Sequence, residues 1–303
     1  MIRFLEQEEI DTQAWDYCIN HSAHPVVYAY SWYLDNICDT WGALVLNEYE
    51  AVFPLPYAKK FGVFYVYQPY FCQQLGLFSR VPAGDDLLRD FLNAIPNRFK
   101  LIDLAINKRP VDIKNLKWKE RANYRLDLVN PYEDLISNFT TMHRRNIRKS
   151  YKNDLSIAEQ VDSASIISLY RKYYGNTTPG IIDIHFTYLN RLLANAYGRA
   201  QIICPAVIGE GNRIVAGGIF LSDRNAIYYM LGSGAPDAKN LGAMYALIDY
   251  VIRKYASSGL ILDFEGSDMP GIAQFFEGFG STKTSYYQIR WNRLPFPFSL
   301  LKK

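Results

Sequence analysis

The chain has 303 residues, of which 49% are hydrophobic and 15% aromatic, and its formal net charge at pH 7 is +3. This composition is typical of a folded globular protein, and the length favours two domains of about 150 residues each. The small net charge excludes nucleic-acid binding over the whole surface, so any basic function must be local.

The cysteines, the histidines and the first residues of the chain indicate its compartment and whether it binds a metal. Four cysteines lie far apart without a CxxC spacing, and the segment from Met1 to Asp11 carries four acidic residues. No apolar run in the sequence approaches the roughly 20 residues of a membrane span. The four histidines have no HExxH or comparable ligand spacing. We therefore expect a cytoplasmic protein with no metal site and no transmembrane segment.

The first half of the chain alternates helical and strand patterns. Helices are predicted at Asp11 to Asn20, Ser31 to Cys38 and Asp85 to Ala94. Leu44 to Leu55 is predicted as a strand, a polar turn and a second strand, and Leu101 to Leu104 as a further strand.

A long helix is predicted between the two halves, from Pro131 to Asn153. Its apolar side carries five residues at helical spacing, which are Leu135, Phe139, Met142, Ile147 and Tyr151. Its other side is strongly basic, with Arg144, Arg145, Arg148, Lys149 and Lys152. We interpret this cluster either as a solvated helix face or as a site for a phosphate-bearing acceptor or donor.

The second half begins with the same order of elements. Helices are predicted at Ser163 to Tyr174 and at His185 to Ala196. Ala206 to Leu221 is again predicted as strand, turn and strand, and Ala226 to Leu231 as a β-branched and aromatic strand. A glycine-bearing loop, Gly232 to Gly242, follows that strand.

An amphipathic helix and a strand with two carboxylates come next. The helix has apolar residues at helical spacing, which are Leu241, Met244, Tyr245, Ile248, Val251, Ile252 and Tyr255. Leu260 to Glu265 is predicted as a buried strand, on which Asp263 and Glu265 point to the same face because they are two residues apart. A strand, loop, helix and strand in this order predict a parallel pair.

The two halves match each other at a nearly constant offset. Ala51 and Val215 are 164 residues apart, and the closing strands that begin at Tyr124 and Tyr287 are 163 apart. Because several positions share this register, we infer a tandem duplication. We expect an α/β fold with mixed sheets: an N-terminal module at 1–130, a basic linking helix at 131–155, and a C-terminal module at 156–303 that carries the active site.

Together these features resemble the Fem-type acyltransferases, which are tandems of folds of the GNAT superfamily of N-acetyltransferases. The likeness rests on two sheets of one plan, on the linker His143-Arg-Arg-Asn-Ile-Arg-Lys149, and on Asp263-Phe-Glu-Gly266 followed by Phe275, Phe276 and Phe279-Gly280. It spans about Tyr30 to Trp291. It implies transfer of an acyl group to an amine, from acyl-CoA in most GNAT proteins and from aminoacyl-tRNA in the enzymes that build peptidoglycan cross-bridges.

The resemblance also implies where the donor binds. In the GNAT fold the donor pyrophosphate lies on backbone N–H groups at the start of the helix after the fourth strand. The corresponding positions here are Leu231, Gly232, Lys239, Asn240, Leu241, Gly242 and Ala243. They match the acyl-CoA pattern Q/R-x-x-G-x-G/A only in part, and a glycine for close packing of helix on sheet is the alternative. We expect acyl-CoA as co-substrate and do not favour tRNA, because the chain has no long heptad-patterned insertion.

Transfer to an ammonium group requires a base, because the nitrogen must lose a proton before it attacks. Glu265 and Asp263 are the candidates, and we favour Glu265 as the more exposed of the two; capping the next helix or pairing with an arginine is the alternative for both. Backbone N–H groups near Leu231 and Gly232 would stabilise the tetrahedral intermediate. A tyrosine would protonate the leaving group, and core packing is the simpler interpretation for any single one of Tyr228, Tyr229 and Tyr286.

Three functions stand beside one another. The first is an N-acyltransferase acting on an amino sugar, an amino acid or a cell-wall precursor. The second is a nucleic-acid-binding module that uses the basic helix; DNA binding is not expected, because Tyr151 is the one Phe, Trp or Tyr from Met142 to Lys152. The third is a Fem-like protein that binds a partner without catalysis.

The end of the chain mixes aromatic and basic residues from Arg290 to Lys303, and Pro295 and Pro297 exclude a regular helix there. Such a mixture fits peripheral contact with an anionic membrane surface. From the sequence we favour the alternative, in which the apolar side chains of this segment cover the core of the protein itself, namely Trp291, Phe296, Phe298, Leu300 and Leu301.

Overall fold

The computed structural model describes residues 1–175 and 180–298. The chain forms two compact units, each built from separate stretches of sequence. Unit 1 consists of Met1–Arg121, Thr187–Asn195 and Ser285–Lys303, and unit 2 of Ala122–Phe186 and Ala196–Thr284.

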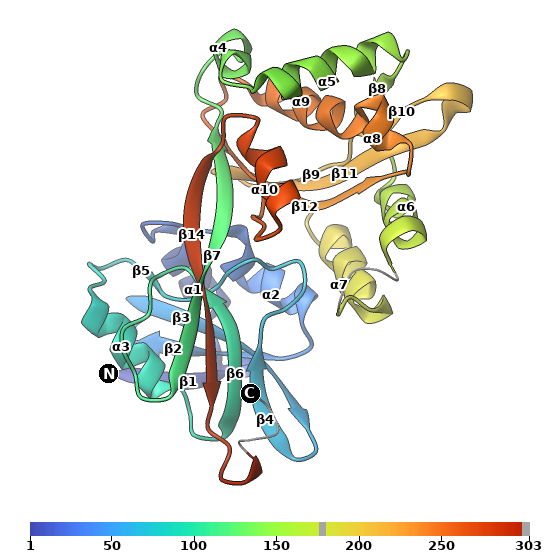
Figure 1. Cartoon of the computed structure of the whole chain (residues 1–303). Coiled ribbons are helices and arrows are strands. Elements are labelled where there is room, and N and C mark those ends of the chain that lie inside the picture. Colours follow the sequence, from blue (N-terminus) through green and yellow to red (C-terminus); the bar gives the residue numbers. More distant parts are fainter. Residues whose placement is uncertain (176–179, 299–303) are drawn as a thin grey trace. The chain divides into compact units, whose positions relative to one another are not determined.

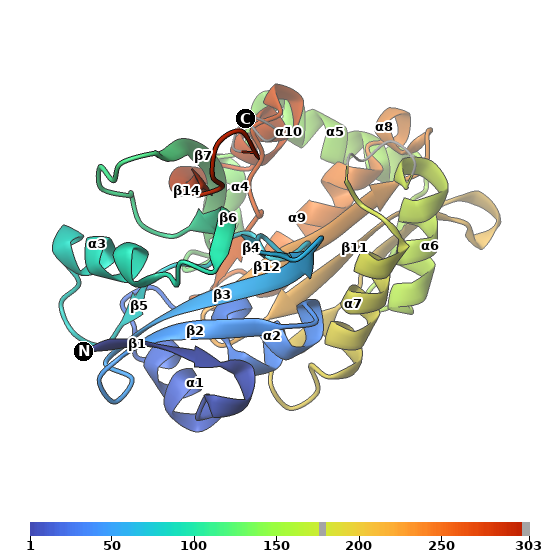
Figure 2. The same ribbon diagram turned by 90° about the horizontal axis from the view of Figure 1, so that it is seen from below.

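Unit 1 is a mixed sheet with helices on both faces. Its strand order is β1 (Ile2–Glu6), β2 (Trp41–Leu46), β3 (Ala51–Lys60), β4 (Val63–Tyr67), β6 (Phe99–Ile106) and β14 (Thr282–Asn292), with β5 (Phe78–Ser79) beside β3. Only β4 and β6 are parallel among these neighbours. Figure 2 shows α1 (Thr12–Asn20) and α2 (Ser31–Ile37) on one face and α3 (Asp85–Ala94) on the other.

Unit 2 has the same kind of sheet. Its strand order is β7 (Leu116–Asp127), β13 (Ile261–Asp263), β12 (Ala226–Gly234), β11 (Ile214–Ser222), β10 (Ala206–Ile208) and β8 (Ser156–Ala158), with β9 (Gln201–Ile203) beside β11. Again one neighbouring pair is parallel, β12 with β13. Its helices are α4 (Tyr132–Ser137), α5 (Thr141–Lys152), α6 (Ser163–Tyr174), α8 (Ala238–Leu241), α9 (Ala243–Tyr255) and α10 (Pro270–Glu277), while α7 (Asp183–Ala194) continues into unit 1.

Figure 1 shows α5 and α9 on one face of the unit 2 sheet and α6 on the other. On the first face, Ile248, Val251 and Ile252 of α9 are buried with Leu262 and Phe264. The remaining described helices are short 3-10 turns at Gln7–Glu9, Val27–Ala29 and Glu210–Asn212. The spacing of the apolar residues in α9 predicts a helix that packs one face on a sheet, and the structure confirms this packing.

The two units repeat one plan, with a difference at their closing strands. In each unit an antiparallel run leads to a parallel pair joined by a crossover helix, α3 in unit 1 and α9 in unit 2. The strand that closes unit 1 beside β6 is β14, from the end of the chain, and the strand that closes unit 2 beside β13 is β7. Both β7 and β14 run through both units. The division therefore differs from the expected 1–130 and 156–303, and residues 131–155 lie within unit 2.

The predicted long helix from Pro131 to Asn153 is wrong, because the structure has two helices there. Thr140 begins the second helix, with its side chain accepting a hydrogen bond from the backbone N–H of His143. The Thr140 hydroxyl therefore bonds a backbone N–H at the start of α5, and this local hydrogen bond favours a new helix start over a continuous helix. The break also changes the buried face, since His143 is buried whereas Met142 and Tyr151 are exposed.

Three observations bear on membrane, metal and redox chemistry. Among the described helices, none is both long and apolar enough to span a bilayer. The described residues include no group of three or more His, Cys, Asp or Glu arranged to hold a metal ion. The four cysteines are free and buried, and burial raises the pKa of Cys18 and of Cys204 to about 11. These thiols are therefore poor nucleophiles at neutral pH.

Candidate active site

The parallel strands β12 and β13 separate early. They pair only from Ala226 to Tyr228 against Ile261 to Asp263, whereas β12 continues to Gly234 alongside β11. Beyond Tyr228, one edge of β12 thus lacks β13 as a partner. Backbone groups on such an edge are available to a ligand or to other side chains.

A β-bulge lies at the point of separation. The register of β11 against β12 shifts between Ile219, which pairs with Leu231, and Phe220, which pairs with Tyr229. The phenol of Tyr229 occupies the place where a side chain of Gly232 would stand, and its ring stacks on Phe220 with 4.8 Å between centroids. A glycine is thus required at 232, and burial raises the pKa of the Tyr229 phenol. Bulges near strand ends commonly redirect groups at functional sites.

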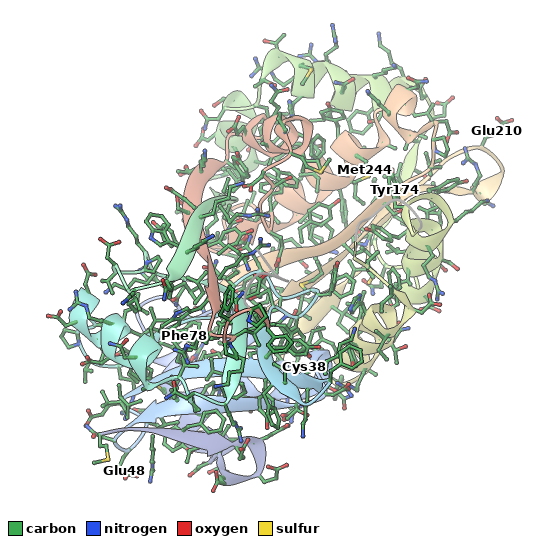
Figure 3. All side chains as sticks on the ribbon, turned by 60° about the horizontal axis from the view of Figure 1, so that its bottom comes forward. Cys38, Glu48, Phe78, Tyr174, Glu210 and Met244 are labelled. Carbon is green, nitrogen blue, oxygen red and sulfur yellow. The ribbon has the colours of Figure 1, made fainter. Side chains whose placement is uncertain are left out.

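Side chains from both faces meet at the end of β12. The Tyr174 hydroxyl, from α6, donates to the Gly234 carbonyl at 3.1 Å, and Met244, from α9, lies 3.6 Å from where a Gly234 Cβ would stand. Figure 3 labels both residues. The neighbouring Ser233 is 1% exposed, and its Oγ has no hydrogen-bond partner among the described residues. A buried hydroxyl without a partner is uncommon, so this edge is incomplete by itself.

Asp263 is 3% exposed, and its carboxylate accepts several hydrogen bonds. The Asn123 amide donates to Oδ2 at 3.1 Å and the Glu265 backbone N–H donates to Oδ1 at 3.0 Å. The Arg125 guanidinium completes an ion pair at 3.3 Å. Burial raises the pKa of Asp263, while Arg125 and the two hydrogen bonds oppose that shift. These contacts give Asp263 a positioning role. Its ion pair with Arg125 is the arginine pairing that the sequence analysis gave as the alternative to a base.

Glu265 lies just past the end of β13 with a left-handed backbone, at φ 63°. The predicted strand to Glu265 is therefore too long, and the alternation that would place its side chain on the Asp263 face is interrupted. The side chain is half-buried, and burial raises the pKa of its carboxyl well above the usual value. Glu265 is more exposed than Asp263, as predicted. A carboxyl with a raised pKa at a strand end is a recurrent property of general bases.

The two candidate tyrosines lie in different environments. Tyr228 is 1% exposed, and its hydroxyl is 3.5 Å from a carboxylate oxygen of Asp223, in the turn that precedes β12. This interaction directs it toward the start of β12 and not toward the end. Tyr286 lies on the part of β14 that belongs to unit 1, whereas Glu265 belongs to unit 2.

The predicted donor positions are partly covered by protein. Leu231 and Gly232 lie on β12, while Lys239 and Asn240 are exposed on the four-residue helix α8. Leu241 leads into Gly242, which has φ 75°, and Ala243 begins α9. A Cβ at Gly242 would stand 2.5 Å from the carbonyl oxygen of Asn146 in α5, so this glycine packs α5 against the start of α9. Gly242 thus serves close packing between two helices, whereas the sequence alternative was packing of a helix on the sheet.

The basic cluster forms a stripe on α5. Arg145, Arg148, Lys149 and Lys152 are exposed and follow the spacing i, i+3, i+4 and i+7, which places them on one face. We call these four residues the α5 stripe. Arg144 differs, because its guanidinium donates to the Ser137 carbonyl at 3.0 Å. The α5 sequence itself contains no acidic residue.

Sequence reasoning missed Asn123, Arg125 and Tyr174. The first two lie two residues apart on β7, so strand alternation places them on one face with Asp263. That alternation is visible in the sequence. Which strand pairs with β13 is not visible, and for that reason the cluster could not be assembled beforehand.

No family model and no curated protein matches this sequence. Solved structures match along nearly its full length. A structure of FemX has a TM-score of 0.68 at 11% identity, covering 96% of this chain and 98% of that one. A conserved protein of unknown function from Bacteroides thetaiotaomicron has a TM-score of 0.61 at 12% identity, over 96% and 99% of the two chains. L-PGS from Bacillus licheniformis has a TM-score of 0.56 at 12% identity, over 96% and 95%.

These similarities define the fold. The chain has the mixed α/β fold of the FemX and L-PGS structures, as the resemblance to Fem-type proteins predicted.

Proposed function

We propose that this protein is an N-acyltransferase whose chemistry takes place at the edge where β12 and β13 separate. The observation that carries the proposal is Glu265, a half-buried carboxyl with a raised pKa that lies two residues past the end of β13. The similarity to FemX and L-PGS supports the proposal at the level of the fold.

In the proposed reaction, the Glu265 carboxylate accepts a proton from the acceptor ammonium group. The free amine then attacks the carbonyl carbon of the donor and forms the new C–N bond, and the bond to the leaving group breaks when the tetrahedral intermediate collapses. Backbone N–H groups of β12 beyond Tyr228 would stabilise the negative oxygen of the tetrahedral intermediate. The leaving group takes up a proton, so the overall charge is conserved. Asp263 would hold Glu265 in place through the Glu265 backbone N–H.

The donor is proposed as one of two classes. Acyl-CoA was favoured from the sequence, with its phosphates at Lys239 to Ala243. Two features of unit 2 favour aminoacyl-tRNA instead. Gly242 is buried against α5, and the N–H groups of Leu241 and Gly242 already donate to carbonyls of the preceding turn. The α5 stripe offers four exposed cations to a polyanion.

The acceptor is proposed to be the amine of an amino sugar, an amino acid or a cell-wall precursor. A structure at a TM-score of 0.51 and 11% identity is described as a putative lysylphosphatidylglycerol synthetase domain, so a lipid is a further acceptor class to test.

Binding and transfer measurements separate these options from a non-catalytic protein. Calorimetry with CoA and filter binding with aminoacyl-tRNA would identify the donor, and mass spectrometry of an acceptor panel would detect the product. We expect tRNA binding in the micromolar range or tighter and no CoA binding. A protein that binds neither donor and yields no product would favour the non-catalytic alternative.

A further inference from the structure

Unit 1 exposes large aromatic side chains at two separate points of the chain. Phe61, in the turn between β3 and β4, is 95% exposed, and Phe296 and Phe298, after β14, are 81% and 56% exposed. The expectation that the terminal apolar side chains cover the core is therefore wrong for Phe296 and Phe298. Trp291 is partly buried, and Leu300 and Leu301 lie outside the described residues.

The register of the sheet places both points at one end of unit 1. Lys60 pairs with Val63 across the turn, and Phe64 of β4 pairs with Phe99 at the start of β6. At this same end of β6, Leu101 pairs with Asn292 of β14. Because β4, β6 and β14 are successive neighbours, the turn and the segment after β14 are separated laterally by about two strand spacings, or about 10 Å. Figure 1 shows both at the lower end of unit 1.

Both points are held by the sheet beneath them. The Arg293 backbone N–H donates to the Lys100 carbonyl at 2.7 Å, and its guanidinium donates to the Ile95 carbonyl at 3.0 Å. These bonds fix the start of the terminal segment on β6. The two-residue turn at Phe61 and Gly62 is closed by the pairing of Lys60 with Val63. The Phe61 turn is thus anchored at its base, and the terminal segment is anchored where it leaves β14, three residues before Phe296.

Aromatic rings elsewhere at this end of the sheet are used internally. Arg98 lies over the rings of Phe4, Tyr57, Phe64 and Phe99, and it forms an ion pair with Glu6 at 2.6 Å. By contrast, Phe61 contacts only the ammonium of Lys60, at 5.5 Å from its ring centroid, among the ring contacts of the described residues. The turn adds Lys59 and carries no acidic residue from Tyr57 to Tyr67. Of these two cations, Lys60 lies against the exposed Phe61 ring and Lys59 lies over the Phe64 ring, 5.0 Å from its centroid. An exposed ring with cations in the same turn is suited to the boundary between an apolar layer and a negatively charged surface.

We propose that the Phe61 turn and the Phe296–Phe298 segment form a docking edge that seats unit 1 on an anionic phospholipid bilayer. The phenylalanine rings enter the boundary between headgroups and acyl chains, and Lys59 and Lys60 contact the phosphates. The contact is peripheral and reversible, because only a few side chains enter the bilayer. The proposal does not depend on the proposed acyl transfer.

Co-sedimentation of the full chain with vesicles tests the docking edge. The vesicles contain phosphatidylcholine alone or a mixture with phosphatidylglycerol. We expect binding to the mixed vesicles, a loss of at least about tenfold in affinity for the triple variant Phe61→Ser, Phe296→Ser, Phe298→Ser, and a loss of the preference for phosphatidylglycerol in Lys59→Gln, Lys60→Gln. Tyr197→Ser is the matched control, because Tyr197 is likewise 95% exposed but lies in unit 2.

Unaltered thermal unfolding of each variant would show that the effect is on docking. A second measurement uses Phe61→Trp and Tyr197→Trp with brominated lipids, and we expect added quenching only for the first. The proposal is overturned if the wild type ignores anionic vesicles, or if the triple variant binds them as the wild type does. It is also overturned if the triple variant instead abolishes self-association of a wild type that does not bind lipid.

Discussion

Glu265 combines two properties that a general base needs, which are partial access to solvent and a carboxyl whose pKa is raised by burial. Replacing it by glutamine keeps the shape and removes the base. We expect Glu265→Gln to lower kcat by about 10²- to 10⁴-fold, the usual contribution of general base catalysis. The rate of the wild type should rise with pH through the raised pKa, and the variant should lose that rise. Glu210→Gln, at the exposed glutamate labelled in Figure 3, is the control.

The same carboxyl makes a prediction about stability. Because its pKa is raised in the folded state, the folded protein binds the proton more tightly than the unfolded chain does. This contribution is fully present below the ordinary pKa of glutamate and is lost as pH rises through the raised value. Glu265→Gln should thus gain stability relative to the wild type on going from about pH 4 to about pH 8. Urea unfolding at both pH values measures it, and a difference that does not change with pH would contradict the assignment.

At the scale of elements, Gly242 joins α5 to the start of α9. Its φ of 75° disfavours any side chain, and a Cβ would also meet the Asn146 carbonyl at 2.5 Å. Gly259 has the same φ but nothing within 4 Å of its Cβ position. An alanine at 259 therefore measures the cost of the left-handed backbone alone, without a steric clash. We expect Gly259→Ala to cost about 1–2 kcal/mol. Gly242→Ala should cost about 1–3 kcal/mol more, because overpacking adds to the strain. Chemical denaturation measures both losses of unfolding free energy. Equal losses for Gly242→Ala and Gly259→Ala would show that contact with α5 does not restrict the side chain at position 242.

The α5 stripe places like charges at i, i+3 and i+4, where each pair costs a few tenths of a kcal/mol. Replacing Arg145, Arg148, Lys149 and Lys152 by glutamine should therefore leave the melting temperature unchanged or slightly higher. If the stripe binds tRNA, affinity should fall, and the slope of log K against log[salt] should drop by about 0.7–0.9 for each phosphate that the variant no longer neutralises.

The matched control replaces four exposed cations elsewhere in unit 2 by glutamine, namely Lys172, Arg199, Arg224 and Lys283. It changes the net charge equally, so an equal effect on tRNA binding would argue against a specific role for α5.

At the scale of the whole molecule, local patterns predicted most elements but not their partners. The bounds of α3 and α6 agree with the prediction, because apolar spacing, and for α6 the Asp162 cap, are local signals. The exchange of closing strands was not predictable, since Tyr124 to Leu128 and Tyr287 to Trp291 have the same alternation whichever unit they join. The site follows the same rule. Asp263 and Glu265 were identified from the sequence, whereas Asn123 and Arg125 depend on the pairing of β7 with β13.

The central claim is acyl transfer to an amine at the end of β12 and β13. Its most direct test is a single-turnover assay with aminoacyl-tRNA or acyl-CoA labelled in the acyl group, an amine acceptor panel, and wild-type and Glu265→Gln protein. The account predicts a labelled amide with the wild type, formed faster as pH rises, and formation slowed by about 10²-fold or more in the variant. Label transfer at equal rates by both proteins, or no amide from either donor class with any acceptor, would contradict it.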